Sequence, residues 1–182
     1  MNRTLQNTML HLRRFAQCEG GNATVEFVMV VPFMFIIFFS AMEGGMLSTQ
    51  HVALERGLDL AVRDVRIGQL SNPDHTKLAK QICDYAVIIK DCEQNIRLEM
   101  MTADPRNWAA PSKVVRCVDR SEDGSPVIDI TNGLNNQLMI LRACVLFDPM
   151  TPGSGLGKAL PKESEGAYAL VATSSYVMEP FQ

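Results

Sequence analysis

The chain has 182 residues, with 17 lysines and arginines against 20 aspartates and glutamates, and a formal charge of −3. This length suits one modest domain with an additional segment, and the composition excludes collagen-like, low-complexity and wholly disordered chains. The slight acidity and the lack of Lys/Arg-rich blocks argue against nucleic acid as a main partner. Five of the eight phenylalanines lie between Phe27 and Phe39, within an uncharged run from Phe27 to Met42. This distribution favours a membrane or exported protein.

The amino-terminal segment has the composition of a membrane anchor with a basic leader. Residues 1–21 contain three arginines and one glutamate, and Glu26 is the only ionisable side chain in residues 22–42. A helix over residues 22–42 would be about 31 Å long, enough to cross a hydrocarbon core of about 30 Å. The uncharged part, residues 27–42, would span only about 24 Å, so the predicted transmembrane helix is short and ends at Glu43.

The basic residues predict the orientation of this anchor. Arg13 and Arg14 precede the apolar run, and a positively charged flank stays in the cytoplasm. We therefore predict a single-pass protein with a cytoplasmic amino terminus and a carboxy-terminal part outside the cytoplasm.

Three interpretations of the apolar segment compete. A cleaved secretory signal is disfavoured, because the apolar core exceeds the usual length of about 7–15 residues and no clean small-x-small site follows it. A plain uncleaved anchor explains the apolar run but not Glu26, whose carboxylate would cost about 2.5–3.5 kcal/mol in a membrane span. The third interpretation accounts for Glu26.

This third interpretation starts from the motif G-x-x-x-x-E-F. The motif occupies Gly21 to Phe27, directly after the basic leader and directly before the apolar run. This arrangement resembles the prepilin-peptidase site of type IV pilin-like proteins and, within that group, the TadE-like minor pilins (pseudopilins) of the tight-adherence (Tad) pilus system. The resemblance implies cleavage after Gly21, with Asn22 as the new amino terminus and with Glu26 and Phe27 as recognition and assembly residues. Residues 142–181 also resemble the carboxy-terminal part of TadE-like proteins.

A cleaved amino terminus would explain why a carboxylate is kept in an apolar helix. Cleavage after Gly21 creates a positively charged α-amino group, which Glu26 of a neighbouring subunit, shifted by about one helical turn, could pair with in the membrane. Two buried opposite charges are costly alone and offset each other when they are adjacent, so the pair would set the stagger between helices. In the alternative interpretation Glu26 lies at the headgroup boundary and only ends the span.

The remaining residues predict an α+β domain outside the membrane. Residues 43–70 have the pattern of an amphipathic extension of the first helix, with charged residues on a solvated face and an apolar stripe of Leu47, Leu54, Leu58, Ala61 and Val65. After a break at residues 71–74, a second helix is predicted from His75 to about Lys90. Strands of a small antiparallel sheet are predicted over residues 96–101, 113–118, 127–130, 137–147 and 168–178, with a Pro- and Gly-rich loop over residues 148–166. Residues 71–182 would form this extracytoplasmic domain.

The cysteines indicate disulfides. There are five, and cleavage after Gly21 would remove Cys18 and leave four: Cys83, Cys92, Cys117 and Cys144. Of the three possible pairings we favour Cys83–Cys92 and Cys117–Cys144, the second joining two strands. Nine residues of unbroken helix would separate the first pair by about 13.5 Å, beyond the limit of about 7 Å for a bridge, so the helix must end near residues 90–91. Four reduced thiols, or a zinc site lacking a C-x-x-C knuckle, are the alternatives.

The sequence contains no complete catalytic or ligand-binding motif. Residues 153–158 fail as a phosphate loop, because the required first glycine falls at Pro152 and Lys158 is followed by Ala159. Residues 119–130 fail as a calcium loop, because the last position lacks the required glutamate. We therefore predict a non-enzymatic protein without catalytic residues, metal or cofactor.

We interpret the chain as a minor pilin or pseudopilin needed for assembly of a tight-adherence pilus. The resemblance implies three kinds of partner: prepilin peptidase, other pilin-like subunits and inner-membrane pilus assembly proteins. It also implies a location in the bacterial inner membrane with a periplasmic carboxy-terminal domain. The alternative is an uncleaved single-pass anchor whose outer domain binds a partner in the envelope.

Overall fold

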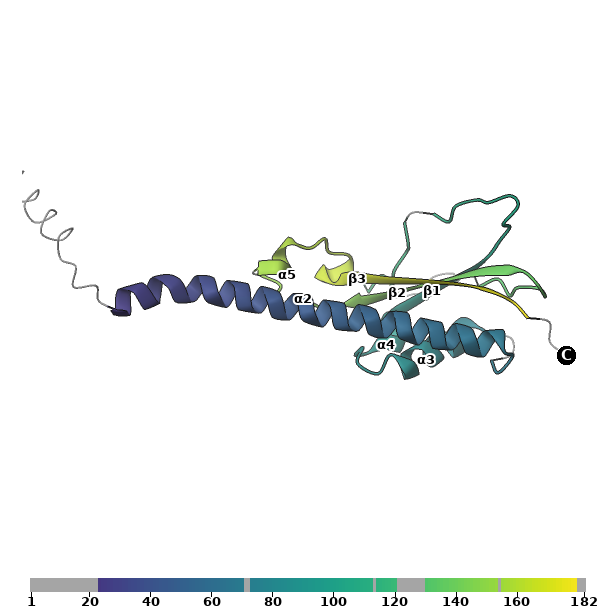
Figure 1. Ribbon diagram of the computed structural model, residues 1–182, viewed down its shortest axis with the longest axis horizontal. Helices are drawn as coiled ribbons and strands as arrows, with labels where there is room; N and C mark the ends of the chain where they lie inside the picture. The colour runs from purple at the N-terminus through teal and green to yellow at the C-terminus, as the bar shows by residue number, and fades with distance from the viewer. Residues whose placement is uncertain (1–22, 71–72, 113, 121–129, 154, 180–182) are drawn as a thin grey trace, which may run out of the picture. The chain divides into compact units, whose positions relative to one another are not determined.

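The structure is a computed structural model that describes residues 23–70, 73–112, 114–120, 130–153 and 155–179 (Figure 1). The chain divides into two compact units, Met1–Phe39 and Ser40–Gln182, which are described separately. The basic leader predicted over residues 1–21 lies outside the described residues.

The first unit contributes the beginning of a long helix, α2, which runs from Ala23 to Arg66. Its residues between Val25 and Phe39 are almost all exposed apolar side chains, and Pro32 lies inside the helix without ending it. The prediction of one long helix, apolar at first and amphipathic later, is confirmed.

In the second unit the later part of α2 buries one face. Four residues of the predicted apolar stripe, Leu54, Leu58, Ala61 and Val65, are fully buried in the core. After Arg66 the chain turns with Gly68 at a φ of 76°, a left-handed conformation that glycine adopts without strain and that commonly ends a helix.

The second helix is shorter than predicted. Helix α3 runs from His75 to Tyr85 and is capped by Asp74, whose Oδ1 accepts a 2.7 Å hydrogen bond from the backbone N–H of Lys77. The prediction that it reaches residue 90 was wrong. The backbone leaves the helical conformation at Ala86, because the chain must turn back to bring Cys92 to Cys83 for their disulfide. A short helix, α4, follows over Cys92–Asn95.

Three strands form one antiparallel sheet in the order β1-β2-β3. They are β1 (Ile96–Ala103), β2 (Leu138–Phe147) and β3 (Tyr168–Val177). The central strand places Ala143 opposite Leu98 of β1 and Ala172 of β3. This sheet, together with the helices, confirms the predicted α+β class.

The two faces of the sheet have different roles. One face completes the hydrophobic core with α2 and α3, and its β2 residues are Met139, Leu141, Ala143 and Val145. The other face carries Arg142 and Cys144, which are also buried. Segments outside the sheet therefore cover this second face.

One of those segments was predicted as a strand and is not one. Residues 114–118 have no regular structure, and Val114 is 74% exposed, since this segment finds no strand partner and is held to β2 by a disulfide. Residues 127–129 of another predicted strand lie outside the described residues, and Ile130 makes an isolated bridge with Met100. The predicted loop of residues 148–166 contains a short helix, α5 (Gly155–Ala159), and a 3-10 turn, η1 (Ser164–Gly166).

Candidate functional site

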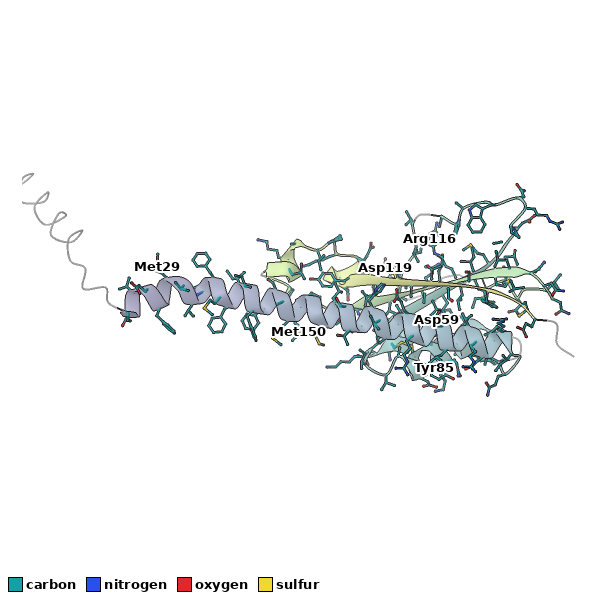
Figure 2. The ribbon with its side chains drawn as sticks, viewed as in Figure 1. Met29, Asp59, Tyr85, Arg116, Asp119 and Met150 are labelled. Atoms are coloured by element: carbon teal, nitrogen blue, oxygen red, sulfur yellow. A yellow bond between two sulfur atoms is a disulfide. The ribbon has the colours of Figure 1, made fainter. Side chains whose placement is uncertain are left out.

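The apolar part of α2 is long and apolar enough to cross a membrane, judged by its length and composition. Phe27 is 66% exposed, and the other large apolar residues up to Phe39 are exposed as well, except for the half-buried Val31. Figure 2 shows such side chains around the helix near Met29. An aqueous surface rarely carries so many apolar side chains without a partner, so lipid or apolar protein must cover this segment.

Glu26 lies in the first turn of α2, directly before Phe27. Its side chain is exposed, and the amino-terminal end of a helix favours a negative charge by about 0.3–1 kcal/mol in exposed positions. The structure therefore leaves the Glu26 carboxylate accessible to another chain. The other residues predicted for processing and topology, Arg13, Arg14, Gly21 and Asn22, lie outside the described residues.

A second carboxylate on α2 has a different environment. Glu43 is only 1% exposed, and it accepts three hydrogen bonds from the segment after β2. Its Oε1 accepts from the backbone N–H of Met150 at 3.0 Å, and its Oε2 accepts from the backbone N–H and the hydroxyl of Thr151 at 3.0 and 3.1 Å. Burial, and after it the nearby Glu43 charge, raise the pKa of Tyr168. In the sequence Glu43 had only marked the end of the apolar run.

Further contacts hold the same segment against α2. The backbone N–H of Leu156 donates to the Ser40 hydroxyl at 3.3 Å, and a Cβ on Gly44 would lie 3.5 Å from Leu156 Cδ2. Gly157 packs so closely against Thr151 that any side chain there would clash with the Thr151 backbone. Residues 150–153 and 155–157 thus bind the turn of α2 at the end of the apolar run.

Both disulfides that we favoured from the sequence are present in the structure. Cys83 is bonded to Cys92 with a Cα–Cα distance of 5.7 Å, and Cys117 to Cys144 with a Cα–Cα distance of 5.3 Å. The first closes the turn between α3 and α4. The second was predicted to join two strands, but it joins an irregular segment to β2.

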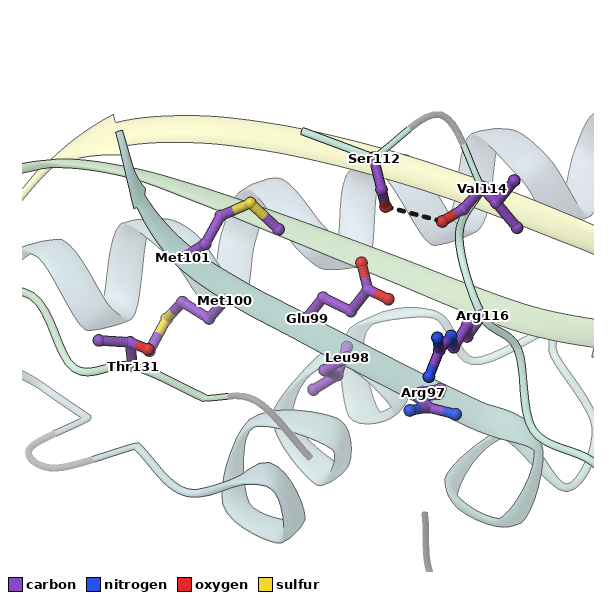
Figure 3. Close-up of a pocket in the computed structure, with 9 residues that line it drawn as sticks. All are labelled: Arg97, Leu98, Glu99, Met100, Met101, Ser112, Val114, Arg116 and Thr131. Atoms are coloured by element: carbon purple, nitrogen blue, oxygen red, sulfur yellow. Dashed lines mark hydrogen bonds between the residues drawn. The ribbon is translucent and has the colours of Figure 1, made fainter. Parts of the chain in front are cut away.

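A cavity of about 550 Å³ lies beside β1 (Figure 3). Among the residues that line it are Arg97, Glu99 and Arg116. Glu99 is opposite Arg142 in the sheet and lies 3.5 Å from its guanidinium, which also donates to the backbone carbonyl of Ser112 at 2.9 Å. Two arginines and one glutamate therefore lie on the walls of this cavity.

The histidines of the described chain are not arranged as a catalytic or metal site. His51 Nε2 lies 3.1 Å from the carbonyl oxygen of Val171 and 3.8 Å from Glu55. His75 begins α3, where burial, and after it the charge of Arg97, lower its pKa. Within the described residues, no group of three or more His, Cys, Asp or Glu side chains could hold a metal ion.

Comparison with known protein families gives a match near the amino terminus. Residues 21–63 match the family model described as TadE-like protein. No curated protein and no solved structure matches the chain. The match covers the apolar part of α2 and most of its amphipathic part, and it contains Gly21, Glu26 and Glu43. The likeness of residues 142–181 to the same family stays a prediction.

Proposed function

We propose that this chain, whose residues 21–63 match the TadE-like family model, is a TadE-like minor pilin or pseudopilin that supports assembly of a tight-adherence pilus. The TadE-like family is structural and pilus-associated and is not a known enzyme family. A helix that can span a membrane supplies the anchor that this role requires.

The observation that carries this proposal is the position of Glu26. It is a single carboxylate at the head of an exposed apolar helix, inside the segment that matches the family. A carboxylate costs about 2.5–3.5 kcal/mol in a membrane span, so a partner for its charge is expected. We propose that prepilin peptidase cleaves after Gly21 and that the new α-amino group of Asn22 on a neighbouring pilin-like subunit is this partner.

The spacing of the two charges would set how subunits stack. Asn22 and Glu26 are four residues apart, which corresponds to about 6 Å along a helix. Two helices shifted by that distance would place the amine of one beside the carboxylate of the other. Phe27 would pack beside this pair and exclude water, which strengthens the attraction between the charges.

The proposed topology follows from the basic leader. Arg13 and Arg14 would stay in the cytoplasm, the apolar part of α2 would cross the inner membrane of a bacterium, and the chain after this span would lie in the periplasm. An oxidising periplasm would keep the two disulfides formed. The inner-membrane pilus assembly proteins would then contact α2 and this periplasmic unit.

Mass spectrometry of the full chain extracted from membranes tests processing. The expected mature protein begins at Asn22 and contains no free thiol. A protein that begins at Met1 would contradict the proposal and would favour the uncleaved anchor whose outer domain binds an envelope partner.

A pair of variants tests the role of the carboxylate. Glu26→Ala is expected to leave processing intact but to abolish pilus formation and co-purification with pilin-like subunits. Glu55→Ala is the matched control, because Glu55 is an exposed carboxylate on the same helix outside the apolar run. Normal piliation in Glu26→Ala would refute the pairing, and a defect in both variants would refute a specific role for Glu26.

A further inference from the structure

Beyond the apolar run, α2 stays almost free of ionisable side chains for two more turns. From Phe27 to Gln50 there are 24 residues, and Glu43 is the only one that can carry a charge. The uncharged residues 27–42 span only about 24 Å, against a hydrocarbon core of about 30 Å. Four more residues, up to Met46, would supply the missing length of about 6 Å.

Glu43 would block this extension if its carboxylate faced lipid, but it does not. The carboxylate is 1% exposed and receives hydrogen bonds from Met150 and Thr151. These donors replace the water that an ionised carboxylate needs, so the charge is shielded from the surroundings of the helix. The segment after β2 thus removes the one obstacle to a span of full length.

The same segment must then lie where α2 leaves the hydrocarbon. Met150, Thr151 and Leu156 lie against Ser40, Glu43 and Gly44, and these α2 positions extend over about 6 Å of helix. With the span ending at Met46, these positions lie in about the last 9 Å of the hydrocarbon, next to the headgroup layer. We infer that residues 149–153 and 155–162, here called the collar, lie at the boundary between the acyl chains and the lipid headgroups and contact phospholipid directly.

The surface of the collar fits that position. Met150 is 55% exposed, and the adjoining Pro152 and the nearby Ala159 and Pro161 are exposed as well. In water these exposed apolar atoms contribute no stabilising free energy, whereas at the boundary of headgroups and acyl chains they are removed from water, which is favourable. The charges of the exposed collar lysines Lys158 and Lys162 are balanced by Glu163 and Glu165, which follow the collar directly. The position of the collar along α2, and not a net charge of this region, therefore places it at the membrane.

This inference rests on the membrane span in the proposed function, but not on cleavage or on a role in the pilus. Tryptophan fluorescence of the full chain in lipid nanodiscs tests it, because Trp108 is the only tryptophan and Trp108→Phe gives a silent background. The lipid is phosphatidylcholine whose acyl chains carry bromine, a quencher, close to the headgroup.

Reporters are placed one at a time in that background. Met150→Trp and Ala159→Trp report on the collar, and both positions are exposed, so the larger ring needs no room inside the fold. Phe33→Trp reports on the apolar run. Ile67→Trp is the matched exposed control just after the end of α2, about 30 Å of helix beyond Met46.

The expected result is a loss of emission in brominated lipid for Phe33→Trp, Met150→Trp and Ala159→Trp, and none for Ile67→Trp. If Phe33→Trp is quenched while both collar reporters behave like Ile67→Trp, the collar does not touch lipid and the inference is overturned. If the emission of Phe33→Trp is not quenched, α2 does not cross the membrane. That result would refute both the membrane anchor of the proposed function and the lipid contact of the collar.

Discussion

Gly57 of α2 packs closely against the end of α3, and replacing it with alanine probes this packing. A Cβ at this position would lie 2.7 Å from the carbonyl oxygen of Ile82 and 3.1 Å from the Cβ of Ala86. The same carbonyl accepts the 2.9 Å hydrogen bond from the N–H of Ala86 that ends α3. Both neighbours belong to a turn tied down by the Cys83 disulfide, so they cannot move away without cost.

Two effects of opposite sign determine the free energy of unfolding. Alanine gains about 0.8–1.0 kcal/mol over glycine in a helix interior. Overpacking against a backbone carbonyl typically costs about 1–3 kcal/mol. The expected net result for Gly57→Ala is a loss of up to about 2 kcal/mol.

Gly45→Ala is the matched control, because it makes the same change in the same helix. Gly45 is exposed, and a Cβ there meets nothing within 4 Å, so only the helix-propensity gain applies. The difference in unfolding free energy between the two variants isolates the overpacking cost, expected to be about 1–3 kcal/mol.

The assay is reversible chemical unfolding of the full chain in detergent micelles, with the disulfides intact. Faster hydrogen exchange at the Ala86 amide in Gly57→Ala would show that the loss arises at the end of α3. Equal stabilisation by both alanines would refute the packing described for α2 and α3.

Three other predictions concern stability. Glu43→Ala leaves the partly buried N–H groups of Met150 and Thr151 without their acceptor and is expected to lower the unfolding free energy by about 2–4 kcal/mol, with faster hydrogen exchange at both amides. Unchanged exchange would contradict the role of Glu43. Chain-entropy estimates for loops with sequence separations of 27 and 9 predict a loss of about 3.5 kcal/mol for Cys117→Ser/Cys144→Ser and about 2.6 kcal/mol for Cys83→Ser/Cys92→Ser, so chemical unfolding should rank the variants in that order. Burial lowers the pKa of His75 in the folded state, so its contribution to stability is complete above the unfolded pKa of about 6.5 and is lost as the pH falls below that value. The unfolding free energy of His75→Gln should therefore fall less steeply than that of the unchanged protein between about pH 7.5 and about pH 5, and an equal slope would show that His75 does not cause the pH dependence.

Local patterns predicted much of the fold, because they record which side of an element faces the core. The stripe from Leu54 to Val65 repeats with the period of a helix, and all its members are buried. Ile96, Leu98 and Met100 alternate with exposed or half-buried residues, as in a strand with one buried face. The Asp74 side chain caps a residue only three positions further along the chain, so the start of α3 could likewise be predicted from the local sequence.

Patterns failed where a residue's partner lies far away in the chain. Val114 and Val115 have the composition of a strand, yet they find no strand to pair with. The charged residues of α2 were expected on a solvated face, but Asp59 accepts a hydrogen bond from Ser174 and Asp64 accepts one from Tyr85. Such contacts depend on which elements the fold brings side by side.

The two carboxylates of α2 show this division most clearly. Glu26 stands out in the sequence, because a charge among apolar residues is unusual wherever the helix is placed. Glu43 looked like the end of the apolar run, and its true environment depends on Met150 and Thr151, which lie 107 and 108 residues further along the chain. Hydrophobic patterning is a property of neighbouring residues, whereas the burial of a charge depends on donors that only the folded chain brings to it.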